Sequence, residues 1–237
     1  MKLIPSSPLG NRLLVSLVSW ILLGCSPEDP PPRGDTFHVV VLGSSTAAGA
    51  GPAHPLQAWA ARYEHFLQQQ SGEFRLTNLA QPGYLSYQLM PTGFLPPAGR
   101  PWPDPKHNLT RALQLRPDAL LINLPSNDTD AGYSLPEQLD NLRYLAQQAQ
   151  KRGVAVWVTT TQPREFHPDK VRLQEQLRDS ISVHFGERSI DFWSGLGDCA
   201  GWPLPEYNAG DGVHLNAAAH QIFFERVKAK PIFPRAE

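Results

Sequence analysis

The sequence has few cysteines and little net charge, and each of these scarcities excludes a class of protein. Cys25 and Cys199 are the only two cysteines among 237 residues, which excludes a disulfide-stapled scaffold and a cysteine-rich zinc module. The 21 basic residues nearly balance the 22 acidic ones, so we expect no nucleic-acid partner. Hydrophobic residues make up 41% of the chain and charged residues 18%, which is typical of a globular protein.

Sequence motifs for metals and phosphate-containing cofactors are also missing. The 8 histidines include no HExxH pair, which would bind zinc on one helix face. The glycine-rich segment 43–51 lacks the Gly-Lys-Ser/Thr ending of a phosphate loop and the spacing of a dinucleotide-binding turn. We therefore predict neither a metal nor a cofactor.

Long hydrophobic runs are absent as well. The longest apolar-biased run is Leu13–Leu23. As a helix it would rise only about 16 Å, too little for the ~30 Å hydrocarbon core of a membrane. Lys2 and Arg12 precede the run without any acidic residue, so residues 1–24 are predicted to be a secretory signal peptide.

The run ends in Leu22-Leu23-Gly24-Cys25, which resembles a bacterial lipobox. The resemblance implies cleavage before Cys25, lipidation of that cysteine, and an extracytoplasmic protein anchored to the membrane through its lipid. An ordinary signal peptide that happens to contain a cysteine is the alternative. Residues 25–36 are rich in proline and charge and are predicted to form a short tether. One domain is predicted over 37–237.

Within this domain, apolar segments of two kinds alternate along the chain. β-branched runs without polar alternation are typical of strands buried on both faces, and apolar residues at spacings of three and four indicate helices. The alternation predicts a five-stranded parallel sheet with helices on both faces, and a functional site at the carboxyl ends of the strands. The strands are expected over 37–42, 74–79, 119–124, 154–160 and 189–192, and the helices over 55–70, 109–115, 135–151, 169–185 and 216–228.

Polar or glycine-containing segments follow the first three predicted strands. Ser44 and Ser45 follow the first strand, Gly83 follows the second, and Asn127 with Asp128 follows the third. Each segment taken alone is explained as well by an ordinary turn, because serine, glycine, asparagine and aspartate all favour turns. The serines almost match the G-x-S-x-G elbow of α/β-hydrolases, but its last glycine is an alanine here.

The segment before the last predicted helix contains Asp211 and His214. A spacing of three residues lets one turn bring the carboxylate to Nδ1 of the histidine, which directs Nε2 toward a nucleophile. A turn-forming aspartate beside a surface histidine is the alternative. Arg164 follows the fourth strand, at the edge where the site is expected, and could bind a substrate carboxylate or pair with Glu165.

Taken in chain order, the serine, glycine, asparagine and Asp-x-x-His segments resemble the SGNH hydrolase superfamily, often called GDSL esterases. The resemblance implies a flavodoxin-like, three-layer α/β/α fold. It also implies a catalytic triad of Ser45, His214 and Asp211. The oxyanion hole would combine the N–H groups of Ser45 and Gly83 with the side-chain amide of Asn127.

The sequence departs from the family pattern at two positions. Ser44 stands where the family has the aspartate of its Gly-Asp-Ser motif, and Pro125 replaces the glycine of its Gly-x-Asn-Asp block. The resemblance implies a serine esterase, with carbohydrate esters, lysophospholipids and small acyl esters all open as substrates. An acyltransferase using the same triad and a non-catalytic surface-binding lipoprotein on this scaffold are the alternatives.

Overall fold

The structure is a computed structural model that describes Met1, residues 36–71 and residues 73–233. The predicted signal peptide, the lipidation site Cys25 and the tether up to residue 35 lie outside the described residues, Met1 apart. These predictions therefore stay predictions. Among the helices that the structure describes, none is both long and apolar enough to cross a membrane.

The five strands that the structure describes lie in one parallel sheet, as the sequence predicts. Their order is β2-β1-β3-β4-β5, so the chain reverses its direction of winding between β1 and β3. In doubly wound sheets such a reversal leaves a crevice at the carboxyl ends of the two central strands, where ligands bind. The strands are β1 (Phe37–Gly43), β2 (Phe74–Asn78), β3 (Ala119–Asn123), β4 (Ala155–Thr159) and β5 (Ser189–Ile190).

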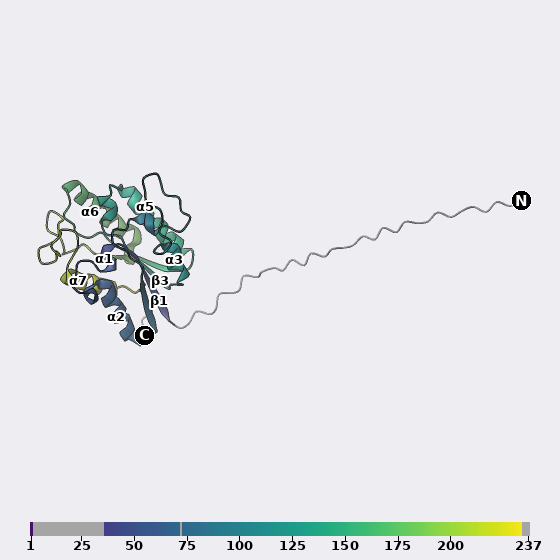
Figure 1. Cartoon of the computed structure of the whole chain (residues 1–237). Helices are drawn as coiled ribbons and strands as arrows, with labels where there is room; N and C mark the ends of the chain where they lie inside the picture. Colours follow the sequence, from purple (N-terminus) through teal and green to yellow (C-terminus); the bar gives the residue numbers. More distant parts are fainter. Residues whose placement is uncertain (2–35, 72, 234–237) are drawn as a thin grey trace. The chain divides into compact units, whose positions relative to one another are not determined.

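Helices cover both faces of the sheet, which gives the predicted three layers. Figure 1 shows α2 and α7 on one side of the sheet and α3, α5 and α6 on the other, and each group packs into its own apolar cluster. The α-helices are α1 (Ser45–Ala48), α2 (Trp59–Ser71), α3 (Leu109–Gln114), α4 (Asn127–Asp130), α5 (Leu135–Gln150), α6 (Pro168–Phe185) and α7 (Ala217–Lys228), and the 3-10 helices are η1 (Pro55–Gln57), η2 (Ser86–Leu89) and η3 (Gly186–Arg188).

The central strand β1 explains why its sequence shows no polar alternation. Val39 and Val41 belong to the apolar cluster on the α2 and α7 side, whereas Val40 and Leu42 belong to the cluster on the opposite side. All four side chains are completely buried. Apolar residues are therefore needed at successive positions, as in other strands of parallel sheets.

Two sequence predictions about helices were wrong in detail. The helix expected from Pro55 begins at Trp59, because the extended backbone of Ala58 separates it from the 3-10 turn η1. Leu56 belongs to this 3-10 turn and not to the buried face of α2, and it is 70% exposed. The four-residue helices α1 and α4 were not predicted, because so short a segment shows no helical periodicity in its sequence.

Candidate active site

Ser45 lies at the carboxyl end of the central strand β1. Ser44 has an extended backbone and precedes the first residue of α1, which is Ser45. The Ser45 side chain is 8% exposed, so only a small part of it meets solvent. This is the strand end where the sequence predicts the nucleophile.

Asp211 and His214 lie together in the loop before α7. One carboxylate oxygen of Asp211 accepts hydrogen bonds from the backbone N–H groups of Val213 at 2.9 Å and His214 at 2.8 Å. The other oxygen lies 2.7 Å from Nδ1 of the His214 ring. The turn predicted from the three-residue spacing is therefore present, and local hydrogen bonds form it.

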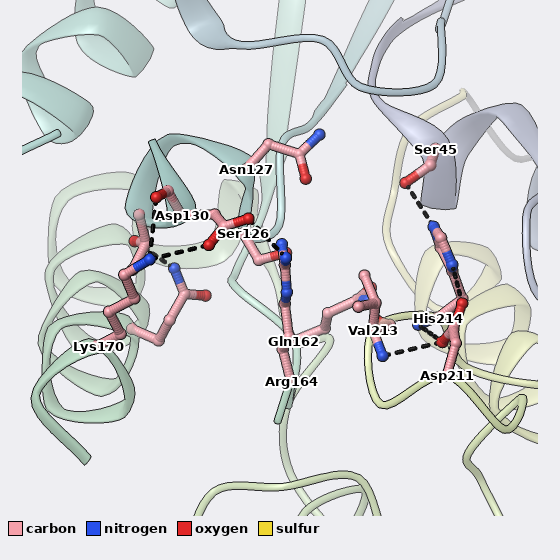
Figure 2. Close-up of polar contacts among 12 residues, drawn as sticks. Ser45, Ser126, Asn127, Asp130, Gln162, Arg164, Lys170, Asp211, Val213 and His214 are labelled. Atoms are coloured by element: carbon pink, nitrogen blue, oxygen red, sulfur yellow. Dashed lines mark hydrogen bonds and ion pairs between the residues drawn. The ribbon is translucent and has the colours of Figure 1, made fainter. Parts of the chain in front are cut away.

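His214 connects this loop to Ser45. Its Nε2 lies 3.1 Å from Oγ of Ser45, and Figure 2 shows Ser45, His214 and Asp211 in a continuous row. A carboxylate can only accept hydrogen bonds, so Nδ1 of His214 carries the proton and Nε2 is left to accept one. The hydroxyl of Ser45 then donates to Nε2, which is the arrangement that activates a serine for nucleophilic attack.

The charge of Asp211 is stabilised by its hydrogen bonds. Burial by itself raises the pKa of this carboxyl, but the donors supplied by His214 and Val213 outweigh burial and lower the pKa to about 2. Asp211 is therefore negatively charged throughout the neutral pH range. It can offset the positive charge that His214 gains when it takes a proton.

The nucleophile segment and the histidine loop also touch through their backbones. Gly51 has φ of +110°, and a Cβ added there would lie 1.9 Å from the carbonyl oxygen of Leu215. Only glycine combines this backbone conformation with so close an approach. The chain that follows α1 therefore packs directly against the loop that carries His214.

The two further residues predicted for the oxyanion hole lie on neighbouring segments. Gly83 has φ of +79°, a left-handed conformation that favours glycine. Asn127 is the first residue of α4, and its side-chain Nδ2 donates a hydrogen bond to the carbonyl oxygen of Tyr84 at 3.1 Å. The structure thus links Asn127 to the residue that follows Gly83. An amide nitrogen carries two hydrogens, so one is left for a ligand.

Asp128 follows Asn127 but faces the interior. Its carboxylate accepts a hydrogen bond from the backbone N–H of Ser86 at 2.9 Å, and the residue is 7% exposed. Burial raises the pKa of Asp128 to about 6, although the hydrogen bonds from Ser86 act in the opposite direction. Asp128 therefore links the loop after β3 to the start of η2.

Arg164 follows β4, as predicted, and its ion-pair partner is Asp130 rather than Glu165. Arg164 pairs with Asp130 at 2.7 Å and donates to Oγ of Ser126 at 3.3 Å (Figure 2). The pair with Glu165, which was one of two alternatives, is replaced by the pair with Asp130, because α4 presents Asp130 to the guanidinium and this helix was not predicted. The guanidinium also lies 4.4 Å from the centre of the Phe166 ring. Binding of a substrate carboxylate by Arg164 stays a prediction.

Gln162, which no motif singled out, connects the segment that follows Ser45 to the loop that carries His214. Its Oε1 accepts a hydrogen bond from Oγ1 of Thr46 at 2.9 Å, and its Nε2 donates to the carbonyl oxygen of Val213 at 3.1 Å. Thr46 follows Ser45 in the chain, and Val213 precedes His214. The position of Gln162 after β4, at the expected edge of the sheet, was the only signal in the sequence.

No described cluster of histidine, cysteine, aspartate and glutamate side chains is arranged to hold a metal ion. The residues brought together at this edge are a hydroxyl, an imidazole, a carboxylate and amide donors. They are suited to acyl transfer through a covalent serine intermediate.

Comparison with known proteins gives one family and several related folds. The model of the GDSL-like lipase/acylhydrolase family matches residues 41–222. The solved structure of TesA has a TM-score of 0.60 and 21% identity, over 83% of this chain and 99% of that chain. Esterase EstA from Pseudoalteromonas sp. has a TM-score of 0.54 and 17% identity, over 81% of this chain and 95% of that one.

A third solved structure, a two-domain esterase active on acetylated mannans, has a TM-score of 0.54 and 14% identity, over 85% of this chain and 52% of that one. No curated protein matches the chain. At these identities the solved structures support the fold, whereas the family model covers most of the chain and identifies the family. The chain belongs to the GDSL-like lipase/acylhydrolase family and is an enzyme that acts on ester bonds.

Proposed function

We propose that the protein hydrolyses acyl esters through a triad of Ser45, His214 and Asp211. The observation that carries this proposal is the row of hydrogen bonds from Oγ of Ser45 through the His214 ring to Asp211, with distances of 3.1 and 2.7 Å. Oγ attacks the ester carbonyl carbon while Nε2 of His214 takes the hydroxyl proton. Nε2 then gives this proton to the departing alcohol, which leaves an acyl group on Ser45.

Water completes the reaction. His214 removes a proton from the water as it attacks the acyl group, and the proton returns to Oγ of Ser45 when the carboxylic acid departs. The side chain of His214 is 26% exposed and that of Asp211 is 51% exposed, so water can reach the histidine.

The negative oxygen of the tetrahedral intermediate would be stabilised by three donors. They are the N–H of Ser45 at the first position of α1, the N–H of Gly83, and the second amide hydrogen of Asn127. A single donor of this kind typically contributes about 10²- to 10³-fold in rate. The link between Asn127 and Tyr84 supports the proposal, because it holds two of the donor segments together.

Carbohydrate esters, lysophospholipids and small acyl esters all fit this chemistry. One structural neighbour is an esterase active on acetylated mannans. Trp102 and Trp202 lie in proline-containing loops and are 67% and 40% exposed, so their rings are accessible to a sugar face. We also propose that the enzyme is held at an extracytoplasmic membrane surface by a lipid on Cys25, which palmitate labelling of the wild type and Cys25→Ser would test.

Two neighbouring serines make a matched test of the nucleophile. Ser45→Ala is expected to lower kcat at least about 10³-fold on nitrophenyl esters and acetylated sugars, and to abolish labelling by a fluorophosphonate. Ser44→Ala removes a hydroxyl that is fully buried and has no hydrogen-bond partner in the described residues, so its kcat should stay within about threefold.

If Ser44→Ala were inactive and Ser45→Ala kept its activity, the nucleophile would be Ser44. Equal activity of both variants and the wild type would reject the serine mechanism. An inactive wild type across the whole ester panel, without fluorophosphonate labelling, would favour a non-catalytic protein on this scaffold.

A further inference from the structure

Ser45 and His214 come from segments that lie far apart in the sequence, and their local hydrogen bonds do not fix the distance between them. Asp211 shapes the histidine loop from within, through its bonds to Val213 and His214. Among the described residues, the side chain of Gln162 hydrogen-bonds both to the residue after Ser45 and to the residue before His214. We propose that Gln162 is a positioning residue that keeps Nε2 of His214 within hydrogen-bond distance of Oγ of Ser45. This inference rests on the proposed function.

The partners of Gln162 determine which way its amide is turned. The carbonyl oxygen of Val213 can only accept a hydrogen bond, so Nε2 of the glutamine must face it. Oε1 is then directed at Thr46, whose hydroxyl must act as the donor. One donor and one acceptor are required at the two ends of the same side chain. A glutamine meets this requirement, whereas an ionised glutamate would place an oxygen against the oxygen of Val213.

Burial makes these two hydrogen bonds consequential. Gln162 is 1% exposed and Thr46 is 2% exposed, so neither side chain can exchange its partner for bulk water. A buried polar group that loses its partner costs about 1 to 3 kcal/mol. Moving Thr46 away from Val213 would break one of the two hydrogen bonds of Gln162 and would therefore cost free energy.

The backbone that leads from β4 to Gln162 is itself held by hydrogen bonds to β5 and to α6. The N–H of Thr160 donates to the carbonyl oxygen of Ile190 in β5 at 2.8 Å. Oγ1 of Thr161 donates to the carbonyl oxygen of Gln174 in α6 at 3.0 Å. Gln162 thus extends from an anchored segment, and Figure 2 shows it beside Val213 in the loop that carries His214. Such anchoring is what lets one side chain set a distance between two others.

A loss of this contact should act on the chemical step. Proton transfer from Ser45 to His214 requires heavy atoms within about 2.6 to 3.2 Å. Gln162 touches neither of these reacting atoms in the structure, so its removal would change their distance while leaving the substrate contacts of other segments in place. We therefore expect an effect on kcat and little effect on KM.

The test uses variants of both partners in the full-length protein. Gln162→Met keeps the length of the side chain but removes both hydrogen bonds, and it is expected to lower kcat about 10- to 100-fold with KM within about twofold. Thr46→Val removes one of the bonds and should have a smaller effect in the same direction. The double variant should be no slower than Gln162→Met alone, because both changes break one connection.

Thr77→Val is the matched control for Thr46→Val. It removes a threonine hydroxyl that bonds to His38 at 2.9 Å, near the amino end of β1 and away from Ser45. Its kcat should equal that of the wild type. Each variant is assayed well below its own Tm, so that a loss of folded protein does not enter kcat. If Gln162→Met does not fold, Thr46→Val and the next variant still decide the question.

Gln162→Glu provides a readout that a merely structural role would not change. When its carboxyl is protonated, the group can donate to Val213 and accept from Thr46 as the glutamine does. When it ionises, the connection to Val213 is lost. The ratio of the variant's kcat to that of the wild type should therefore be close to one at low pH and fall at least about tenfold as pH rises.

The ratio is taken at each pH, so a pH dependence that is common to both proteins cancels. A pH-independent ratio, a kcat of Gln162→Met within twofold of the wild type, or additive effects of Thr46→Val and Gln162→Met would each overturn the inference. These outcomes differ from failure of the proposed function, which is shown by an active Ser45→Ala whatever the Gln162 variants do.

Discussion

The two sides of the active site are built from different kinds of contact. On the histidine side, Asp211 binds N–H groups two and three residues away, and Asn208 binds the N–H groups of Gly210 and Gly212. On the α4 side, the partners come from distant parts of the chain. Asp128 binds Ser86, Asn127 binds Tyr84, and Asp130 binds Arg164. The histidine loop is shaped locally, whereas α4 is placed by the tertiary structure.

The pKa values of the aspartates on the two sides are shifted in opposite directions, for different reasons. Asp211 is half exposed and has donors on both oxygens, which lower its pKa to about 2. Asp128 is 7% exposed, and its burial raises the pKa to about 6. On the histidine side, Asp211 is thus held as a negative charge beside His214. On the α4 side, Asp128 is a buried acid, and its ionisation lowers the stability of the fold.

The largest effect is expected from a substitution on the histidine side. Asp211→Asn retains an oxygen that can accept from Val213 and His214, so the loop should keep its shape. The amide nitrogen would face Nδ1 as a second donor and favour the wrong histidine tautomer. We expect kcat to fall about 10²- to 10⁴-fold, with the thermal unfolding temperature nearly unchanged. Steady-state kinetics and calorimetry measure both quantities.

The pH dependence of the wild type gives a second test of the role of Asp211. Asp211 in the wild type stays ionised down to about pH 2, so its titration should not cause any loss of activity between pH 4 and 7. A kcat of Asp211→Asn within threefold of the wild type would mean that His214 does not depend on Asp211 for its orientation.

A smaller effect, on stability, is expected on the α4 side. The folded-state pKa of Asp128, about 6, is above its ordinary value, so the folded protein holds a proton that the unfolded chain releases between about pH 4 and 6. Stability is therefore present at low pH and falls as pH rises through this window. Asp128→Asn cannot ionise, and from pH 4 to 8 its free energy of unfolding should gain about 2 to 3 kcal/mol relative to the wild type.

Urea unfolding of both proteins at each pH measures this difference. His220, whose burial lowers its pKa to about 4, changes stability in the opposite direction over nearby pH values. It is present in both proteins, so its contribution cancels in the comparison. A difference that stays constant with pH would show that Asp128 titrates normally in the folded protein.

The smallest expected effect concerns the chain that leads into α4. Pro125 is buried directly before Ser126 and Asn127, at the position where the family pattern has glycine. Pro125→Gly should lower the free energy of unfolding by about 1 kcal/mol, because glycine adds freedom to the unfolded chain. We expect kcat to change less than threefold, since Tyr84 and Arg164 still hold α4. A tenfold loss of kcat with unchanged stability would instead make Pro125 a determinant of the position of Asn127.

The sheet, and the strand ends where Ser45 and Asn127 lie, could be predicted from sequence patterns. Buried strands have continuous apolar runs because both of their faces are covered. The Asp-x-x-His spacing indicates a turn in which the aspartate hydrogen-bonds to the histidine. Arg164 was placed at the correct edge of the sheet, but its partner was not, because Asp130 belongs to a helix of only four residues. For Gln162 the only signal was its position after β4, and its role could not be predicted because its partners are 116 and 51 residues away.

Local patterns were enough to determine the fold class, the family resemblance and the internal geometry of the histidine loop, because these depend on periodicity and on contacts within a few residues. Folding in three dimensions decided how Ser45 and His214 meet, which side chain lies between their segments, and what holds α4. These features depend on packing between distant segments, so no local pattern encodes them. Scarce cysteine had already excluded a disulfide-stapled scaffold and a cysteine-rich zinc module, and balanced charge had given no reason to expect a nucleic-acid partner. Only the folded chain brings the remaining hydroxyl, imidazole and carboxylate within hydrogen-bond distance.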